Sequence, residues 1–382
     1  MIIELRGVEF YNKGAELMLH AIIQKIRQKW PQAIFAMEKS GNAPVSKQRA
    51  LGIYTKVGPI RHGIFSQKWS KLIPKSIRRS FKIVLPSEVN VVLDGSGFAF
   101  GDFWGASAAG SRLADHIQAW KQEGKKIILL PQAFGPFSDP NLVSKMGIIL
   151  READLVFARD PFSFKYLEPL KSFKENIFLK PDFTNLVKGV VPTSFDSTEH
   201  EVAVIPNYKL LESNVFHERQ AYLEILNKIV RYIQNADKKP FFLIHEGVKD
   251  LQLAHDVNEY YHLRISIVQN NNPLIIKGII GKSKAVITSR FHGLVSALSQ
   301  NIPSLCIGWS HKYQALMADY DFEEGLITNS DFHSEELNKK LKMVIEDKTA
   351  NKVSEKLALA SKRQKQLSEE MWEQVFEVIK NN

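Results

Sequence analysis

The chain of 382 residues is 44% hydrophobic and carries a formal net charge of +10, and a single core stops growing at roughly 250–300 residues, so we expect two domains. Its only cysteine, Cys306, excludes an internal disulfide and favours a packing role in a reducing compartment. The N-terminus lacks the residue order of a signal peptide, and no apolar run approaches the ~20 residues of a membrane span, so we expect a cytoplasmic protein.

Short apolar runs alternate with helical patterns along the chain, which is typical of a parallel α/β fold. In the first half the pattern predicts strands at 1–5, 90–93, 126–130 and 155–158 and helices at 14–30, 111–122 and 141–152. In the second half it predicts strands at 201–205, 240–244, 264–268, 285–288 and 304–307, with a helix at 219–235. The composition beyond Ser334 favours helix to the end of the chain.

A polar stretch at 192–200 interrupts this alternation, and we place the domain boundary there. The sequence therefore predicts a Rossmann-like domain at 1–191, a second at 200–332 and a helical segment at 333–382. The two halves share a pattern, since an arginine stands at the end of a predicted strand in each of them. These residues are Arg159 and Arg290. We expect a GT-B-like pair of domains that face each other across a cleft. The alternative is convergent strand-end composition, because short apolar strands resemble one another.

The segment Thr288–Gly293 places a permanent cation, Arg290, beside a titratable imidazole, His292, at a strand-to-helix turn. The N–H groups and dipole of the following helix also favour an anion. This combination suits an anionic substrate that must receive a proton. The alternative is a surface ion pair next to a solvated loop histidine.

Three loops after predicted strands in the first half also carry polar groups. In the first, Asn12 can cap the next helix and Gly14 permits a tight turn. The second, 94–102, is glycine-rich and ends at Asp102, but it lacks the full pattern of a nucleotide-binding loop. The third loop, 131–137, is a rigid, kinked segment at the end of a predicted buried strand, and it could hold Gln132 in place.

The segment 61–82 contains seven Lys or Arg residues and no acid, with aromatic and aliphatic residues between them. We interpret it as a basic amphipathic patch that docks on an anionic membrane surface, at the inner face of the membrane. The alternative is a domain helix with a solvated basic face. We expect no nucleic-acid partner, because no recognised binding motif accompanies the charge.

Taken in order along the chain, these segments resemble the polysaccharide pyruvyl transferase family. The likeness rests on segments 12–16, 94–102, 130–136, 159–163 and 289–293, together with Pro181-Asp182 and His245. The resemblance implies a GT-B-like fold and transfer of pyruvate from phosphoenolpyruvate onto two hydroxyls of a sugar in a cell-surface or exopolysaccharide precursor. It implies no cofactor beyond phosphoenolpyruvate as co-substrate, and the acceptor would be a glycan or a lipid-linked oligosaccharide.

The resemblance places Arg290 and His292 in the donor site, and the chemistry of this transfer suggests the roles of the residues. His292 is the expected general acid and Asp182 the expected base, with Glu16, Asp102 and His245 as alternative bases. The expected donor-binding residues are Arg290, Arg159, His245, Lys312 and Gly293, and the two arginines form a clamp on the anionic donor. The expected acceptor-binding residues are Asn12, Gly14, Glu16, Asp102 and Gln132. The histidine spacing predicts no metal site.

Two other functions share these features. A GT-B glycosyltransferase that uses a nucleotide sugar would have the same fold, basic cleft and arginine. A non-catalytic protein that binds a glycan or a lipid phosphate would show neither turnover nor phosphate release.

Overall fold

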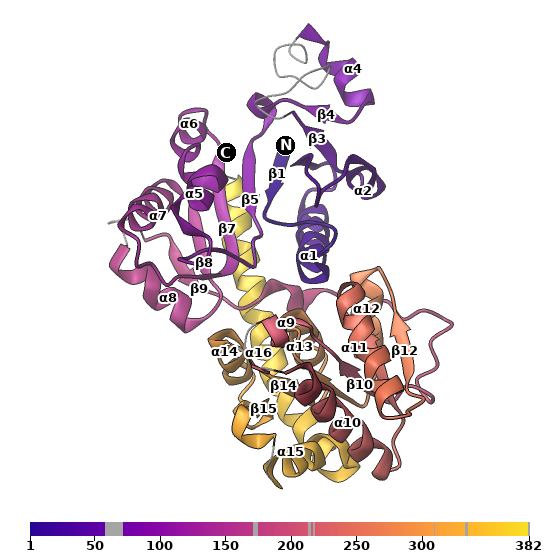
Figure 1. Ribbon diagram of the computed structural model, residues 1–382. Coiled ribbons are helices and arrows are strands. Elements are labelled where there is room, and N and C mark those ends of the chain that lie inside the picture. The colour runs from indigo at the N-terminus through magenta and orange to yellow at the C-terminus, as the bar shows by residue number, and fades with distance from the viewer. Residues whose placement is uncertain are drawn as a thin grey trace. The chain divides into compact units, whose positions relative to one another are not determined.

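The computed structural model describes residues 1–57, 72–170, 175–212, 215–216, 218–308, 310–332 and 335–380. The chain divides into two compact units, one of Met1–Asp182 with Glu369–Asn382 and one of Phe183–Ser368. Each unit contains a parallel sheet flanked by helices (Figure 1), which confirms the α/β fold class.

The N-terminal sheet has the order β4-β3-β2-β1-β5-β7-β8-β9, and β6 pairs with β7. Its strands are β1 (Ile2–Arg6), β2 (Ile34–Glu38), β3 (Tyr54–Lys56), β4 (Ile83–Val84), β5 (Val91–Asp94), β6 (Phe98–Phe100), β7 (Lys126–Phe134), β8 (Leu155–Ala158) and β9 (Ile177–Leu179). From β1 the chain builds outward to β4 and then returns to build the other half from β5. The strand order therefore reverses between β1 and β5, where doubly wound sheets bind their ligands.

The helices of this unit are α1 (Lys13–Lys29), α2 (Val45–Ala50), α4 (Lys75–Ser80), α5 (Gly105–Ala109), α6 (Ile117–Gln122), α7 (Pro140–Glu152) and α8 (Pro161–Leu167). The helix predicted at 111–122 is wrong in detail, because a π-helical turn, η2 (Gly110–Ala114), separates α5 from α6. In this turn the Asp115 N–H donates to the Gly110 carbonyl at 3.0 Å.

The C-terminal sheet has the order β12-β11-β10-β13-β14-β15. Its strands are β10 (Val202–Ile205), β11 (Pro240–Ile244), β12 (Ser266–Gln269), β13 (Ala285–Thr288), β14 (Ser304–Ile307) and β15 (Leu326–Ile327). The helices are α9 (Lys209–Glu212), α10 (Arg219–Asn235), α11 (Gly247–Tyr260), α12 (Pro273–Ile280), α13 (Phe291–Leu298), α14 (His311–Asp319), α15 (Glu335–Ile345) and α16 (Asp347–Lys380).

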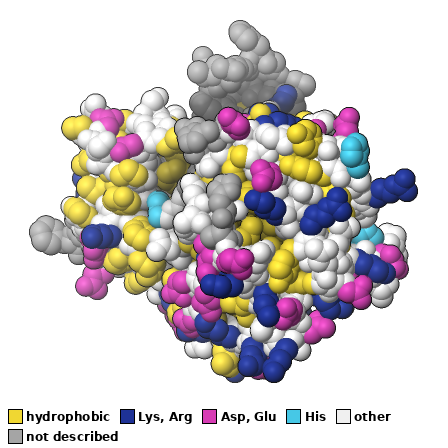
Figure 2. Space-filling model, turned by 60° about the horizontal axis from the view of Figure 1, so that its bottom comes forward, with side chains coloured by type: hydrophobic (Ala, Val, Ile, Leu, Met, Phe, Trp, Pro, Cys, Tyr) yellow, Lys and Arg dark blue, Asp and Glu magenta, His cyan; other side chains and the backbone are white. Residues whose placement is uncertain are grey.

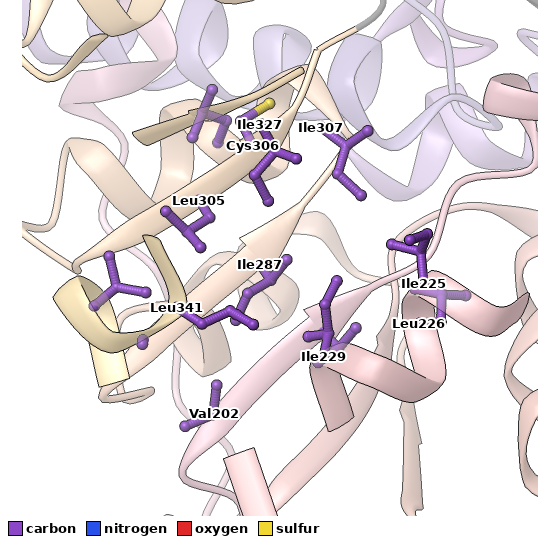
Figure 3. Close-up of a cluster of buried hydrophobic side chains, with 14 of the residues drawn as sticks. Val202, Ile225, Leu226, Ile229, Ile287, Leu305, Cys306, Ile307, Ile327 and Leu341 are labelled. Carbon is purple, nitrogen blue, oxygen red and sulfur yellow. The ribbon is translucent and has the colours of Figure 1, made fainter. Parts of the chain in front are cut away.

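Apolar side chains from the sheet and its helices form the core of this unit. Figure 3 shows Ile287 of β13 and Leu305 of β14 beside Leu341 of α15, with Ile229 of α10 in the same cluster. Cys306 lies in this cluster, and burial raises the pKa of its thiol. Its role is therefore packing.

The unit boundary differs from the one expected at 192–200. Residues after Asp182 already belong to the second unit, because the Val190 N–H donates to the Leu274 carbonyl at 2.8 Å and Gly189 lies against Gly278. The expected separate segment at 333–382 is also divided, since α15 and most of α16 belong to the second unit and the end of α16 to the first.

Part of the basic segment 61–82 lies outside the described residues, which resume at Leu72. In α4, Arg78 is only 7% exposed and forms an ion pair with Glu88, and Arg79 lies 3.4 Å from the same carboxylate. These two cations therefore share one carboxylate from outside the segment. Figure 2 shows cationic and acidic side chains mixed over the face in view. No described helix is long and apolar enough to cross a membrane.

Candidate active site

The carboxyl ends of the C-terminal strands bring polar residues to one edge of the sheet. Asn207 follows β10, His245 follows β11 and Arg290 follows β13. Because these strands are parallel neighbours, the residues that follow them meet at the same edge.

Two acidic residues hold the Arg290 side chain. Its Nε and Nη2 atoms donate to Asp250 Oδ2 at 3.0 and 2.5 Å, and its Nη1 atom donates to Glu246 Oε2. A guanidinium has five N–H donors, so two remain for a ligand. The Arg290 side chain is 14% exposed, whereas that of Asp250 is 1% exposed and that of Glu246 is 27% exposed. Asp250 is thus a fixed partner, and Glu246 is the one that an incoming anion could displace.

Burial raises the pKa of Asp250 to about 6, although the Arg290 guanidinium and the Tyr208 N–H act in the opposite direction. The Tyr208 N–H donates to Asp250 Oδ1 at 2.9 Å, so both carboxylate oxygens have hydrogen-bond partners. Sequence reasoning assigned no role to Asp250 or Glu246, because their acidic side chains become meaningful only when α11 packs beside the end of β13.

Hydrogen bonds to the Ser289 carbonyl fix the turn before Arg290. Asn207 Nδ2 donates to this oxygen at 2.7 Å and the Tyr313 hydroxyl donates to it at 2.9 Å. The Asn207 N–H in turn donates to the Tyr222 hydroxyl at 3.0 Å, and burial raises the pKa of Tyr222 to about 12. These contacts join the ends of β10 and β13 to helices α10 and α14, and they fix the backbone around Arg290.

Helix α13 begins directly after Arg290, which is its N-cap residue. His292 is half-buried in the first turn, and its ring meets that of Phe291 edge-on with centroids 5.4 Å apart. Gly293 lets this turn approach β13, because a Cβ atom there would lie 3.0 Å from Thr288 Oγ1. The first N–H groups of the helix therefore point toward the same strand end as the Arg290 backbone.

Lys312 also belongs to this edge. It lies in the first turn of α14, with Nζ 5.7 Å from the ring centroid of Phe291 and 5.4 Å from that of Tyr313. The structure thus brings Lys312, Arg290, His292 and Gly293 together. His245 is 6% exposed and directly precedes Glu246 at the same edge.

In the N-terminal unit, Arg159 occupies the corresponding position after β8. It is 6% exposed, and its Nη1 atom donates to Asp182 Oδ2 at 3.2 Å. Its backbone N–H donates to the Gln132 carbonyl at 3.0 Å. Gly97 lies next to this pair, since a Cβ atom there would be in van der Waals contact with Arg159 Nη1 at 4.0 Å.

Gln132 is fully buried and donates from Nε2 to Asp94 Oδ1 at 3.1 Å. The Ser96 N–H donates to the same carboxylate oxygen at 3.1 Å. Within the described part of the chain, Asp94 Oδ2 and Gln132 Oε1 have no hydrogen-bond partner. This buried pair retains unused acceptors, and sequence reasoning singled out only Gln132.

The other expected acceptor residues have local structural contacts. Asn12 caps α1 by accepting from the Ala15 N–H at 3.0 Å, as expected, and Gly14 lies inside that helix. Glu16 pairs with Lys13 at 2.8 Å. Asp102 accepts from the N–H and hydroxyl of Ser138, and these bonds lower its pKa. Among the described residues, no hydrogen bond joins Asn12, Glu16 or Asp102 to Gln132.

Within the described ranges, no group of three or more His, Cys, Asp or Glu side chains could hold a metal ion.

Solved structures with the same architecture identify the fold. Anabaena Alr3699/HepE in complex with UDP and glucose has a TM-score of 0.59 at 13% identity, over 99% of this chain and 100% of that chain. UDP-GlcNAc 2-epimerase from Neisseria meningitidis bound to UDP-GlcNAc has a TM-score of 0.59 at 11% identity, over 99% and 100%. S. aureus MnaA with UDP has a TM-score of 0.57 at 12% identity, over 97% and 94%. These matches confirm a GT-B-like fold.

No curated protein sequence matches the chain. A model of the polysaccharide pyruvyl transferase family matches residues 12–311, a range that holds Arg159, Asp182, Arg290 and His292. The match covers most of both units, and the chain therefore belongs to the polysaccharide pyruvyl transferase family.

Proposed function

We propose that the protein transfers pyruvate from phosphoenolpyruvate onto two hydroxyls of a sugar in a cell-surface or exopolysaccharide precursor and releases phosphate. The observation that carries this proposal is the arrangement at the end of β13, where the Arg290 guanidinium, the His292 imidazole and the Lys312 ammonium share one edge of the sheet. An anionic donor that must be protonated requires these kinds of group.

Phosphoenolpyruvate carries a phosphate and a carboxylate. The two remaining N–H groups of Arg290 can bind one of these groups, and displacement of Glu246 would free a third. The α13 N-terminus and Lys312 favour the second anionic group. Asp250 keeps the guanidinium plane in one orientation, so Asp250 acts as a positioning residue.

Ketal formation begins when His292 donates a proton to the methylene carbon of the donor, which becomes a methyl group. The adjacent carbon takes on oxocarbenium character, and the first sugar hydroxyl adds to it and loses its proton to a base. The second hydroxyl then forms the other C–O bond as the bond to phosphate breaks, and its proton leaves with the phosphate. Asp182 is the proposed base, although its ion pair with Arg159 occupies one carboxylate oxygen. Of the alternatives, His245 follows a strand of the same sheet as His292.

The test is turnover with phosphoenolpyruvate and a panel of acceptors: free oligosaccharides, nucleotide sugars and lipid-linked sugars. We expect phosphate release in step with a pyruvyl adduct detected by mass spectrometry, without added divalent metal. In His292→Gln the rate should fall ~10²-fold or more while donor affinity changes little. Turnover of His292→Gln close to that of the wild type would refute the general-acid role, and phosphate release without an adduct would refute the transfer.

Transfer of a sugar from a nucleotide sugar is the second candidate, because the structural neighbours include proteins in complex with UDP and with UDP-glucose. UDP-glucose distinguishes the two reactions. Transfer of glucose to an acceptor without phosphoenolpyruvate would support the second candidate, whereas dependence of product formation on phosphoenolpyruvate supports the first. A non-catalytic binding protein would form neither product.

A further inference from the structure

A pocket of about 620 Å³ opens at the carboxyl ends of β1 and β2 in the N-terminal unit. Arg6, Gly7 and Glu9 line it from the end of β1, Lys39 and Asn42 line it from the loop after β2, and Arg112 lines it from η2. None of the residues assigned to a substrate above lines this pocket. It lies beside the strand reversal between β1 and β5, where sheets of this kind bind ligands.

The acids at the base of the pocket are already neutralised. Glu4 is 3% exposed and pairs with Arg6 at 2.7 Å and with Lys56 at 2.5 Å. Glu38 pairs with Lys56 at 2.8 Å. Lys56 is itself 5% exposed, so the base of the pocket is a built, buried ionic network rather than a loose surface cluster.

Two cations of the pocket have no such partner. Arg112 Nη1 donates to the neutral Ser96 hydroxyl at 2.6 Å. Within the described residues, no carboxylate lies within ion-pair distance of Arg112 or Lys39. The remaining acid, Glu9, accepts from Asn42 Nδ2 at 2.5 Å and presents acceptor oxygens at the wall.

The backbone is shaped to present Arg112. Gly7 has φ of +73°, and a Cβ atom there would lie 1.9 Å from Ser96 Oγ, so only glycine lets Ser96 reach Arg112. Arg112 also lies in the π-helical turn η2, a distortion that is frequent at functional sites. The local geometry thus fixes one uncompensated guanidinium at the pocket wall.

We propose that this pocket binds a phosphorylated sugar, with Arg112 and Lys39 on the phosphate and with Glu9 and Asn42 on sugar hydroxyls. Guanidinium groups bind phosphate oxygens in forked geometry. A carboxylate accepts hydrogen bonds from sugar hydroxyls, and a side-chain amide can both accept hydrogen bonds from them and donate hydrogen bonds to them. This inference rests on the proposed function, because the ligand is the acceptor of the pyruvyl group. The phosphate belongs to a sugar 1-phosphate or to the diphosphate of a nucleotide sugar or lipid-linked sugar.

Calorimetric titration of the full chain tests this proposal with glucose 1-phosphate, UDP-glucose, inorganic pyrophosphate and glucose as probes. We expect the phosphorylated probes to bind and glucose to bind more weakly. Arg112→Gln should weaken the phosphorylated probes roughly tenfold or more, which is the effect of losing a charge-assisted hydrogen bond. Lys39→Gln should weaken them less. Preference for glucose 1-phosphate over UDP-glucose would assign the site to monophosphates, and the reverse would assign it to diphosphates.

Arg151→Gln is the matched control, because Arg151 is 54% exposed on α7 and does not line the pocket. Arg112→Lys keeps the charge and separates loss of binding from loss of folding. The proposal is overturned if no phosphorylated probe binds the wild type or if Arg112→Gln leaves the affinities unchanged. Phosphoenolpyruvate affinity, measured in the same variants, should stay at the wild-type value. That measurement tests the donor site independently, so failure of the pocket and failure of the proposed function give different results.

Discussion

In each sheet an arginine follows the carboxyl end of a strand, Arg159 after β8 and Arg290 after β13. The two arginines nevertheless have different surroundings. Arg290 pairs with two carboxylates, those of Glu246 and Asp250, and its side chain is 14% exposed. Arg159 forms an ion pair with Asp182, and both partners are almost completely buried. If all the carboxylates are ionised, the first cluster has a net charge of −1 and the second is neutral.

We expect this difference to distinguish an arginine that binds the donor from one that mainly stabilises the fold. Breaking a balanced, buried ion pair leaves an uncompensated charge. The cluster of Arg290, Glu246 and Asp250 has an excess of negative charge. An anionic donor can take the place of the Glu246 carboxylate at the guanidinium. The shared strand-end motif therefore predicts position correctly but does not by itself predict the same role for both arginines.

The largest effect should follow Arg290→Ala. The variant removes the hydrogen bonds to the donor anion, each of which contributes about 1.5–3 kcal/mol when charged groups are involved. We expect kcat/KM for phosphoenolpyruvate to fall about 10²-fold or more in steady-state kinetics. Arg290→Lys should recover little of this loss, because the ammonium lacks the forked geometry. Wild-type kinetics in either variant would show that the donor binds elsewhere.

Arg159→Ala should affect stability more than donor binding. The variant leaves the Asp182 carboxylate buried without its partner, which costs about 3 kcal/mol or more of unfolding free energy. Denaturant unfolding measures this loss, and the double variant Arg159→Met/Asp182→Leu should regain most of it. A stable Arg159→Ala protein with strongly weakened donor affinity would instead support the clamp expected from the sequence.

The sequence predicted most strands near the site because these are short, buried and apolar. The strands predicted at 155–158, 240–244, 285–288 and 304–307 agree with β8, β11, β13 and β14. The π-helical turn at Gly110–Ala114 was not predictable, since its residues also suit a continuous helix. Strands β3 and β4 at one edge of the N-terminal sheet were missed because they have only three and two residues, too few for a periodic pattern.

The sequence pointed to the chemical groups of the candidate site but not to the residues that hold them. Arg290 and His292 were visible as a local motif, whereas the hold of Asp250 on Arg290 depends on residues 40 positions apart. Gly7 and Arg112 illustrate the same limit. Gly7 leaves room for the Ser96 hydroxyl, which follows another strand and accepts a hydrogen bond from Arg112. Sequence patterns describe single elements, and these contacts arise only when separate elements pack together.

A smaller effect, of opposite sign, is expected for Glu246→Gln. The amide keeps the size of the side chain but removes a negative charge that competes with the donor for Arg290. One unit charge a few ångströms away in a partly exposed site is worth about 1 kcal/mol, which corresponds to roughly fivefold tighter phosphoenolpyruvate binding. Calorimetry or KM measures this change. Glu212→Gln is a suitable control, since Glu212 pairs with Lys209 and Lys249 on the surface. Weaker donor binding in Glu246→Gln would mean that Glu246 positions Arg290 instead of competing with the donor.

The finest distinction between the two arginines lies in the protonation of Asp250. Burial raises its pKa from an ordinary value of 3.8 to about 6, so between these values the folded protein binds a proton that the unfolded chain releases. The stability from this proton is complete below pH 3.8 and is lost as pH rises through about 6. Asp250→Asn has no such proton. The melting temperature of the wild type minus that of Asp250→Asn should therefore increase as pH falls from 7.5 to 5. A difference that stays constant over this range would show that Arg290 keeps Asp250 ionised, and the cluster would then hold its net charge of −1 throughout the range.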